Sequence, residues 1–198
     1  MARLVERLRP YDFRFVIAPL IEIEPIESGR LDLFQYDWVV LTSITAAREL
    51  RRRAVGRPRK VAAIGAATAE EWGGKVDLVP ATSTQEGLLA ELPRPPGRVL
   101  FAGAEGARRL LVDELGADFV PLYRTKPRRP ETPLHGDLVV LMSASAARAL
   151  GDLGLNIPAV SLGPETTAAA VDAGVRVLRE AETHDLDGLV GAILEVAR

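Results

Sequence analysis

The stretch Asp37-Trp-Val-Val-Leu-Thr-Ser-Ile-Thr-Ala-Ala-Arg-Glu-Leu50 decides the fold, because the chain repeats it one hundred positions later. The second copy reads Asp137-Leu-Val-Val-Leu-Met-Ser-Ala-Ser-Ala-Ala-Arg-Ala-Leu150. Each copy is a short apolar run that ends near a serine and passes directly into an alanine-rich stretch. This pattern is typical of a buried strand followed by a helix.

Two further landmarks are repeated in the same order. Lys60-Val-Ala-Ala-Ile-Gly-Ala-Ala-Thr-Ala69 corresponds to Pro158-Ala-Val-Ser-Leu-Gly-Pro-Glu-Thr-Thr167, again a strand followed by a helix. Gly87-Leu88 corresponds more weakly to Gly188-Leu189, where each pair opens an amphipathic helix. Three landmarks in one order predict two similar lobes within the chain.

Strands and helices alternate along most of the sequence. Strands are predicted at 13–19, 38–42, 60–64, 76–79, 98–102, 118–122, 138–142, 158–162 and 175–178, and helices at 2–9, 44–53, 66–72, 84–91, 107–115, 144–151, 165–173 and 185–197. Continuous apolar strands between helices indicate an α/β fold in which parallel sheets are covered on both faces. We therefore expect two flavodoxin-like or Rossmann-like lobes.

The chain crosses between the lobes twice, which means that one lobe is inserted into the other. The expected inserted lobe covers 36–124. The expected terminal lobe is discontinuous and combines 1–25 with 137–198. The connectors are 26–35 and 125–136, and the second contains Pro127, Pro130 and Pro133, which oppose regular structure.

Composition excludes several classes of function. The 198 residues carry a formal net charge of −2 and 5% aromatic residues, so neither a basic surface nor stacking platforms for nucleic acid are expected. The absence of cysteine excludes disulfides, thiolate nucleophiles and cysteine-bound zinc, and two histidines are too few for a histidine-based metal site. No signal peptide and no apolar run near 18 residues are present, so a cytoplasmic protein without membrane contact is expected.

Four hydroxyl residues stand at the starts of helices that follow strands: Ser43, Thr68, Ser143 and Thr166. One interpretation is that each hydroxyl simply caps the free backbone N–H groups of its helix. The other is that these helix starts bind an anionic ligand, because they carry free donors and partial positive charge. In parallel sheets ligands bind beyond the carboxyl ends of the strands, where these residues lie.

Three more candidates follow strands of the inserted lobe. Gly103 opens Gly-Ala-Glu-Gly, in which backbone amides can approach an anion, although it is neither a Walker loop nor a Gly-x-Gly-x-x-Gly fingerprint. Arg108 in the next turn is either an anion partner or an ordinary solvated arginine. Tyr123 ends the last strand before the second crossing and is either a packed tyrosine or a proton donor, because a phenol with a pKa of about 10 is protonated at neutral pH.

Taken in order, Asp37-Trp-Val-Val-Leu-Thr-Ser43, Val61-Ala-Ala-Ile-Gly-Ala-Ala-Thr-Ala69, Tyr123-Arg-Thr125 and Ser161-Leu-Gly-Pro-Glu-Thr-Thr-Ala168 resemble uroporphyrinogen-III synthase. The resemblance implies two α/β lobes joined by a two-strand linker, with the substrate between them and no cofactor or metal. It implies that Tyr123 is the catalytic tyrosine. It also implies that Ser43, Thr68, Ser143 and Thr166 occupy the substrate-binding positions.

The reaction implied by the resemblance is a lyase reaction of heme biosynthesis. Hydroxymethylbilane loses water and closes to uroporphyrinogen III with ring D inverted. Hydroxymethylbilane also closes unaided, without inversion, so the enzyme chiefly controls position. A monomer is expected, with at most transient contact with hydroxymethylbilane synthase.

Two alternatives compete with this interpretation. A two-lobed binding or sensor module could keep the fold without catalysis, since fold alone does not decide function. The family's opening strand has no counterpart ahead of the helix at 2–9, which favours such a module, whereas the intact Tyr123 favours the enzyme. A single flavodoxin-like or receiver-type domain is rejected, because no acidic pocket or flavin-phosphate loop follows the strands.

Overall fold

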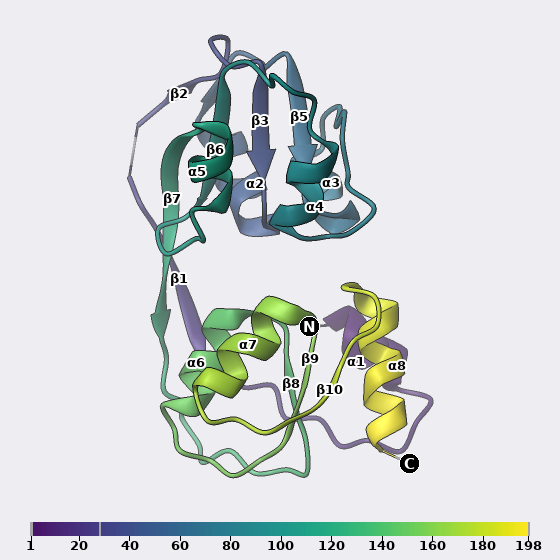
Figure 1. The fold of residues 1–198 in the computed structure, drawn as a ribbon. Coiled ribbons are helices and arrows are strands. Elements are labelled where there is room, and N and C mark those ends of the chain that lie inside the picture. Colours follow the sequence, from purple (N-terminus) through teal and green to yellow (C-terminus); the bar gives the residue numbers. More distant parts are fainter. Residues whose placement is uncertain (1, 28, 198) are drawn as a thin grey trace. The chain divides into compact units, whose positions relative to one another are not determined.

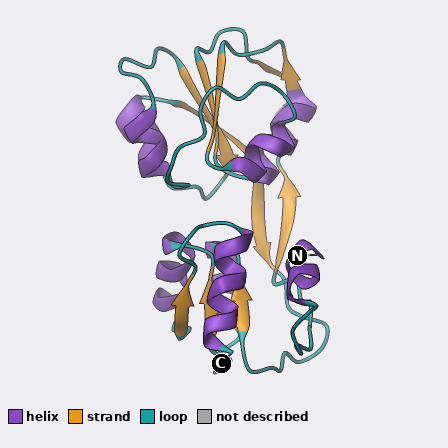
Figure 2. Ribbon diagram, turned by 90° about the vertical axis from the view of Figure 1, so that its right-hand side faces the viewer, coloured by secondary structure: helices purple, strands orange, loops and turns teal. Residues whose placement is uncertain are grey.

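The computed structural model describes residues 2–27 and 29–197, and its internal contacts divide the chain into two compact units. The inserted unit is Ile23–Thr125, and the terminal unit combines Met1–Glu22 with Lys126–Arg198. The chain passes from the terminal to the inserted unit along β1 (Ile21–Pro25) and returns along β7 (Asp118–Pro127) (Figure 1). These two strands are neighbours in one sheet and run in opposite directions (Figure 2).

The inserted unit is built on a five-stranded sheet in the order β1-β7-β6-β3-β5. Its remaining elements are β2 (Leu31–Asp32), β3 (Trp38–Leu41), α2 (Ile44–Arg53), β4 (Ala54–Val55), β5 (Lys60–Ala63), α3 (Ala66–Trp72), α4 (Gln85–Glu91), β6 (Val99–Ala104) and α5 (Leu110–Leu115). The interior strand β3 pairs in parallel with β5 on one side and with β6 on the other. All four of its residues are buried, because helices cover both faces of the sheet.

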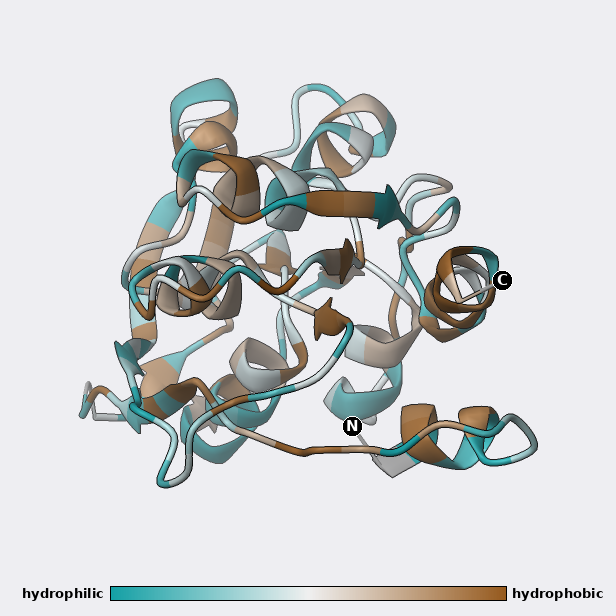
Figure 3. Cartoon of the chain, turned by 90° about the horizontal axis from the view of Figure 1, so that it is seen from below, coloured by the Kyte–Doolittle hydropathy of each residue, from teal (hydrophilic) through white to brown (hydrophobic). Residues whose placement is uncertain are grey.

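The terminal unit contains a three-stranded sheet in the order β10-β9-β8, with both described pairings parallel. Its elements are α1 (Ala2–Leu8), β8 (Val139–Leu141), α6 (Ala144–Gly151), β9 (Ala159–Ser161), α7 (Pro164–Asp172), β10 (Val177–Glu180) and α8 (Leu186–Val196). The strands of this unit are mainly hydrophobic, whereas the helices carry both hydrophobic and hydrophilic residues (Figure 3). Apolar clusters lie on both faces of the sheet, one under α6 and α7 and one under α1 and α8.

The repeat seen in the sequence is confirmed in the local structure of the two units. Ser43 and Ser143 cap α2 and α6 with nearly the same backbone angles, φ −160° and ψ 154° against φ −159° and ψ 150°. Gly87 and Gly188 donate their N–H to the cap residues of α4 and α8. A side chain at either glycine would collide with a backbone carbonyl, that of Thr82 or Thr183, so both helices start on the same glycine-dependent turn.

The two units differ at one edge of their sheets. Within the described residues, β8 pairs only with β9, whereas its counterpart β3 has a partner on each side. Val139 donates its N–H to Pro158 O on the β9 side, so the backbone of Val140 points the other way. Val139 and Val140 are accordingly only half-buried.

The predicted strand at 13–19 is wrong. The segment has no regular structure, and Phe15, Val16 and Ile17 are 41%, 59% and 62% exposed. The apolar composition favours a strand, but a strand also requires a neighbour to satisfy its backbone groups, and this segment has none among the described strands.

Other boundaries also shift. β1 lies after the predicted strand at 13–19 and before the expected connector at 26–35, where no strand was predicted. β7 continues five residues beyond its predicted end, because the two crossing strands satisfy each other's backbone groups. The strand predicted at 76–79 is reduced to a single bridge between Ala62 and Leu78. α5 begins three residues later than predicted. No described helix is both long and apolar enough to span a bilayer.

Candidate functional site

Tyr123 and Ser43 meet within the inserted unit. The Tyr123 hydroxyl lies 2.9 Å from Ser43 Oγ, and Ser43 Oγ also accepts the N–H of Ala46 at 3.0 Å. Ser43 follows β3 and caps α2, while Tyr123 lies in β7. The phenol is therefore held at the carboxyl end of β3, beside the first turn of a helix, where ligands of parallel sheets commonly bind.

The direction of the Tyr123 side chain depends on a bulge in β7. Gly103 of β6 is paired with Pro121, but the next residue, Ala104, is paired with Tyr123, so Leu122 is extra on the β7 side. A bulge of this kind changes which face of the sheet the following side chain points to. Glu105 donates its N–H to Tyr123 O at 2.8 Å and holds the backbone just after the bulge.

Burial dominates the electrostatics of the phenol. Tyr123 is 7% exposed and packs among the apolar residues under α2. This burial raises the pKa of Tyr123 above its usual value of 10.0, and the hydrogen bond with Ser43 partly offsets the rise. The phenol thus keeps its proton throughout the neutral range.

The other predicted residues of the inserted unit lie near the ends of its strands with different partners. Thr68 is buried in α3, and its N–H donates to Gly65 O at 3.1 Å. Gly103 lies in β6 with the ring of Phe101 3.2 Å from where its Cβ would stand, so a larger residue would press on the core. Arg108 is engaged with both carboxylate oxygens of Glu86, at 2.7 and 3.0 Å.

Ser143 and Thr166 belong to the terminal unit. Ser143 Oγ accepts the N–H of Ala146 at 3.2 Å and lies 3.3 Å from Ser145 Oγ. Thr166 is buried in the first turn of α7 and donates its N–H to Gly163 O. Both hydroxyl residues therefore stand at helix starts that follow strands, as predicted, each within its own unit.

The sequence did not identify the most connected hydroxyls of the terminal unit. Ser161 Oγ, fully buried at the end of β9, lies 2.6 Å from Thr167 Oγ1, which also hydrogen-bonds the Glu180 carboxylate. Thr167 rather than its neighbour Thr166 thus joins β9, α7 and β10. The two adjacent threonines after Gly163 were the signal in the sequence for a hydroxyl at this position. The spacing of residues along the helix did not show which of the two side chains faces the sheet.

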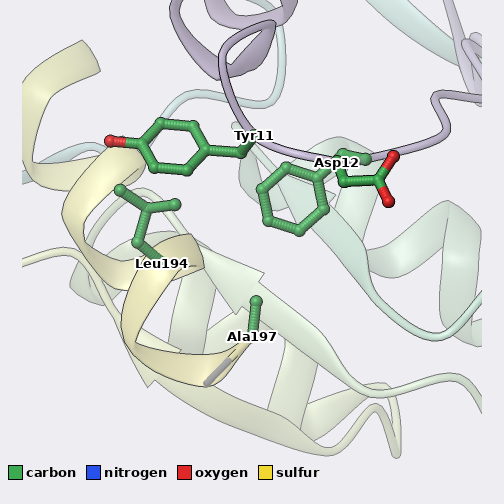
Figure 4. Close-up of a pocket in the computed structure, with 5 residues that line it drawn as sticks. Tyr11, Asp12, Leu194 and Ala197 are labelled. Carbon is green, nitrogen blue, oxygen red and sulfur yellow. The ribbon is translucent and has the colours of Figure 1, made fainter.

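A shallow hollow of about 400 Å³ lies elsewhere in the terminal unit. Its lining residues come from the turn after α1 and from the end of α8, namely Tyr11, Asp12, Phe13, Leu194 and Ala197 (Figure 4). None of them is a predicted site residue, and the lining combines one carboxylate and one phenol with apolar groups. The hollow offers no arrangement of donors for a polyanionic ligand.

Comparison with known proteins agrees with this organisation. A family model described as Uroporphyrinogen-III synthase HemD matches residues 2–191. A protein of Archaeoglobus fulgidus provisionally named uroporphyrinogen-III synthase is 30% identical, over 96% of this chain and 92% of its own length. A uroporphyrinogen-III synthase of Synechococcus elongatus is 26% identical, over 88% of this chain and 80% of its own length.

Solved structures show the same fold. The uroporphyrinogen-III synthetase of Helicobacter pylori has a TM-score of 0.62 at 18% identity, covering 89% of this chain and 91% of that one. A mutant uroporphyrinogen III synthase of Thermus thermophilus has a TM-score of 0.60 at 17% identity, covering 98% of this chain and 94% of that one. The predicted α/β fold is therefore confirmed.

Proposed function

Because this chain belongs to the uroporphyrinogen-III synthase family, we propose that its Ser43–Tyr123 pair supplies the proton that starts the family's lyase reaction. The substrate is a tetrapyrrole, and the membership favours the enzyme over a binding or sensor module. The observation that carries the proposal is the 2.9 Å contact between the two hydroxyls at the carboxyl end of β3.

In the proposed first step Tyr123 donates its proton to the hydroxymethyl oxygen of hydroxymethylbilane. The carbon–oxygen bond breaks with its electron pair on oxygen, water leaves, and a cationic azafulvene remains. Ser43 then donates a hydrogen bond to the phenolate, keeps its own proton, and limits the cost of that charge. Ring closure releases a proton that restores the phenol, so the net change is the loss of one water.

The burial of Tyr123 suits this role. At neutral pH the phenol keeps its proton until a substrate oxygen approaches the hydroxyl, and the hydrogen bond with Ser43 offsets part of the effect of burial on its pKa. Only 7% of the residue is exposed, so the substrate would contact a small part of the phenol. The rest of the ring is fixed by packing, which favours a single direction of proton transfer.

The carboxylates of the substrate are proposed to bind at helix starts. The first turns of α2, α6 and α7 offer backbone N–H groups beside Ser43, Ser143 and Thr166. Thr68 and Gly103 would contribute near the ends of β5 and β6. Arg108 would contribute only by exchanging its pairing with Glu86.

The finer features follow from the same proposal. The substrate is hydroxymethylbilane, received through transient contact with hydroxymethylbilane synthase, and the enzyme acts as a cytoplasmic monomer without cofactor. The test supplies freshly made hydroxymethylbilane and separates type I from type III product. An excess of type III over the enzyme-free control is expected. Type I alone would reject the proposal and favour the non-catalytic module.

A further inference from the structure

Arg53 stands out among the arginines of α2, because its side chain is 13% exposed and reaches two backbone carbonyls. One of them is Leu122 O, 3.2 Å from Arg53 Nη2, and the other is Ile26 O. Leu122 is the bulged residue immediately before Tyr123. Arg53 therefore holds the backbone at the point that sets the direction of the phenol.

From this contact we propose that Arg53, held in place by Glu49, is a positioning residue for Tyr123. The inference rests on the function proposed for Tyr123. It assigns to the Arg53–Glu49 pair a part in turnover, although neither residue contacts the phenol hydroxyl in the described structure.

The Leu122 carbonyl lies at the bulge and has donors from two elements. Leu122 is extra relative to β6, whereas its carbonyl accepts from Ile26, directly after β1. Leu122 O accepts the N–H of Ile26 at 2.9 Å in addition to the Arg53 guanidinium. Leu122 is fully buried, and without the guanidinium its carbonyl would depend on the Ile26 N–H, while Ile26 O would also lose its contact with Arg53.

Glu49 holds the Arg53 guanidinium through an ion pair. This carboxylate is 6% exposed, and it binds Arg53 Nη2 at 3.0 Å and Arg52 Nη1 at 3.1 Å. Hydrogen bonds to charged groups at buried positions restrict the arginine to one rotamer. The guanidinium is therefore pre-oriented toward the bulge rather than free to sample the surface.

One helix thus holds Tyr123 in two places. The start of α2 reaches the phenol hydroxyl through Ser43, and its last residue reaches the adjacent peptide through Arg53. A misplacement of roughly 1 Å can cost about 100-fold in rate when a reaction depends on orientation. Loss of the Arg53 contact would free the bulge to relax while Ser43 remained in place.

The decisive experiment compares Arg53→Met with Arg52→Met in the hydroxymethylbilane assay. Arg52 shares the helix and the Glu49 contact but is 66% exposed and has no hydrogen bond to the bulge among the described contacts. We expect Arg53→Met to lower kcat roughly 10- to 100-fold with little change in KM, and Arg52→Met to leave both nearly unchanged. The remaining Glu49–Arg52 pair reduces the risk that Arg53→Met fails to fold.

A double variant separates positioning from support of the fold. In a Tyr123→Phe background, Arg53→Met should cause no further loss of kcat, because the phenol through which it acts is gone. The inference would be overturned if Arg53→Met lowered kcat equally in both backgrounds, or if Arg53→Met alone had the kcat of the wild type. Arg53→Lys and Glu49→Gln give the same comparison if Arg53→Met does not fold.

The two proposals fail in distinguishable ways. If Tyr123→Phe keeps the wild-type turnover, the proposed proton donor is wrong. If Tyr123→Phe lowers turnover but Arg53→Met does not, the donor stands and only the role of Arg53 is rejected.

Discussion

Ser43 Oγ and the Tyr123 hydroxyl lie 2.9 Å apart although 80 positions separate the two residues in the sequence. The contact joins the N-cap of α2, the first helix of the inserted unit, to β7, the last strand of that unit. It brings together two hydroxyls that the sequence identified for separate reasons, one as a helix start and the other as the end of a strand.

Replacement of Ser43 should affect both stability and the phenol. Ser43→Ala removes a helix cap, worth about 1 kcal/mol of unfolding free energy, together with the hydrogen bond to Tyr123. Thr84→Ala is the matched control, because Thr84 Oγ1 caps α4 by accepting the N–H of Gly87 at 3.0 Å and has no described hydrogen bond to a tyrosine. Denaturant unfolding should show similar losses for both variants, and only Ser43→Ala should also lower kcat. Equal turnover in the two would separate Ser43 from the reaction.

The ionisation of Tyr123 should be displaced to higher pH. Burial raises its pKa, so the folded protein binds this proton more tightly than the unfolded chain. In the unfolded chain the pKa of the phenol is about 10, and below that pH the group is protonated in both states and does not change the free energy of unfolding. As the pH rises from there through the higher pKa of the folded protein, the free energy of unfolding falls. Subtracting the tyrosinate absorbance titration of Tyr123→Phe from that of the wild type isolates this group. A midpoint at or below 10 would contradict the burial described above.

The open edge of β8 should be visible in amide exchange. Val40 lies between two strand partners, whereas the backbone of Val140 faces away from β9, the described partner of β8. Hydrogen exchange followed by NMR should therefore be at least about tenfold faster at Val140 than at Val40. Equal protection would mean that the β8 edge is covered in solution.

The fold was predictable where the sequence repeats. The buried runs Trp38–Leu41 and Val139–Leu141, each followed by a serine cap, correctly predicted β3, β8 and the helices after them. Phe13–Pro19 has the same apolar character but no partner strand, and pairing is a tertiary property that composition cannot supply. The strand β1 was missed for the opposite reason. In Ile21–Pro25 polar residues alternate with apolar ones, and the segment is a strand because it pairs with β7.

The candidate site was predictable in part. Residue type and position in the chain identified Ser43 and Tyr123, and the structure joins them. The bulge at Leu122 and its contact with Arg53 depend on strand register and on a side chain ten residues further along the chain from Ser43, so no local pattern marks them. Thr167 was missed beside Thr166, since adjacent hydroxyls on a helix point in different directions.

The rate of type III product formation from hydroxymethylbilane by Tyr123→Phe tests the central claim most directly. This change removes only the hydroxyl and leaves the packed ring in place. We expect the rate to fall roughly tenfold or more, within the range usual for loss of a general acid, while the unfolding transition stays close to that of the wild type. An unchanged rate of type III formation in a folded Tyr123→Phe protein would contradict the account.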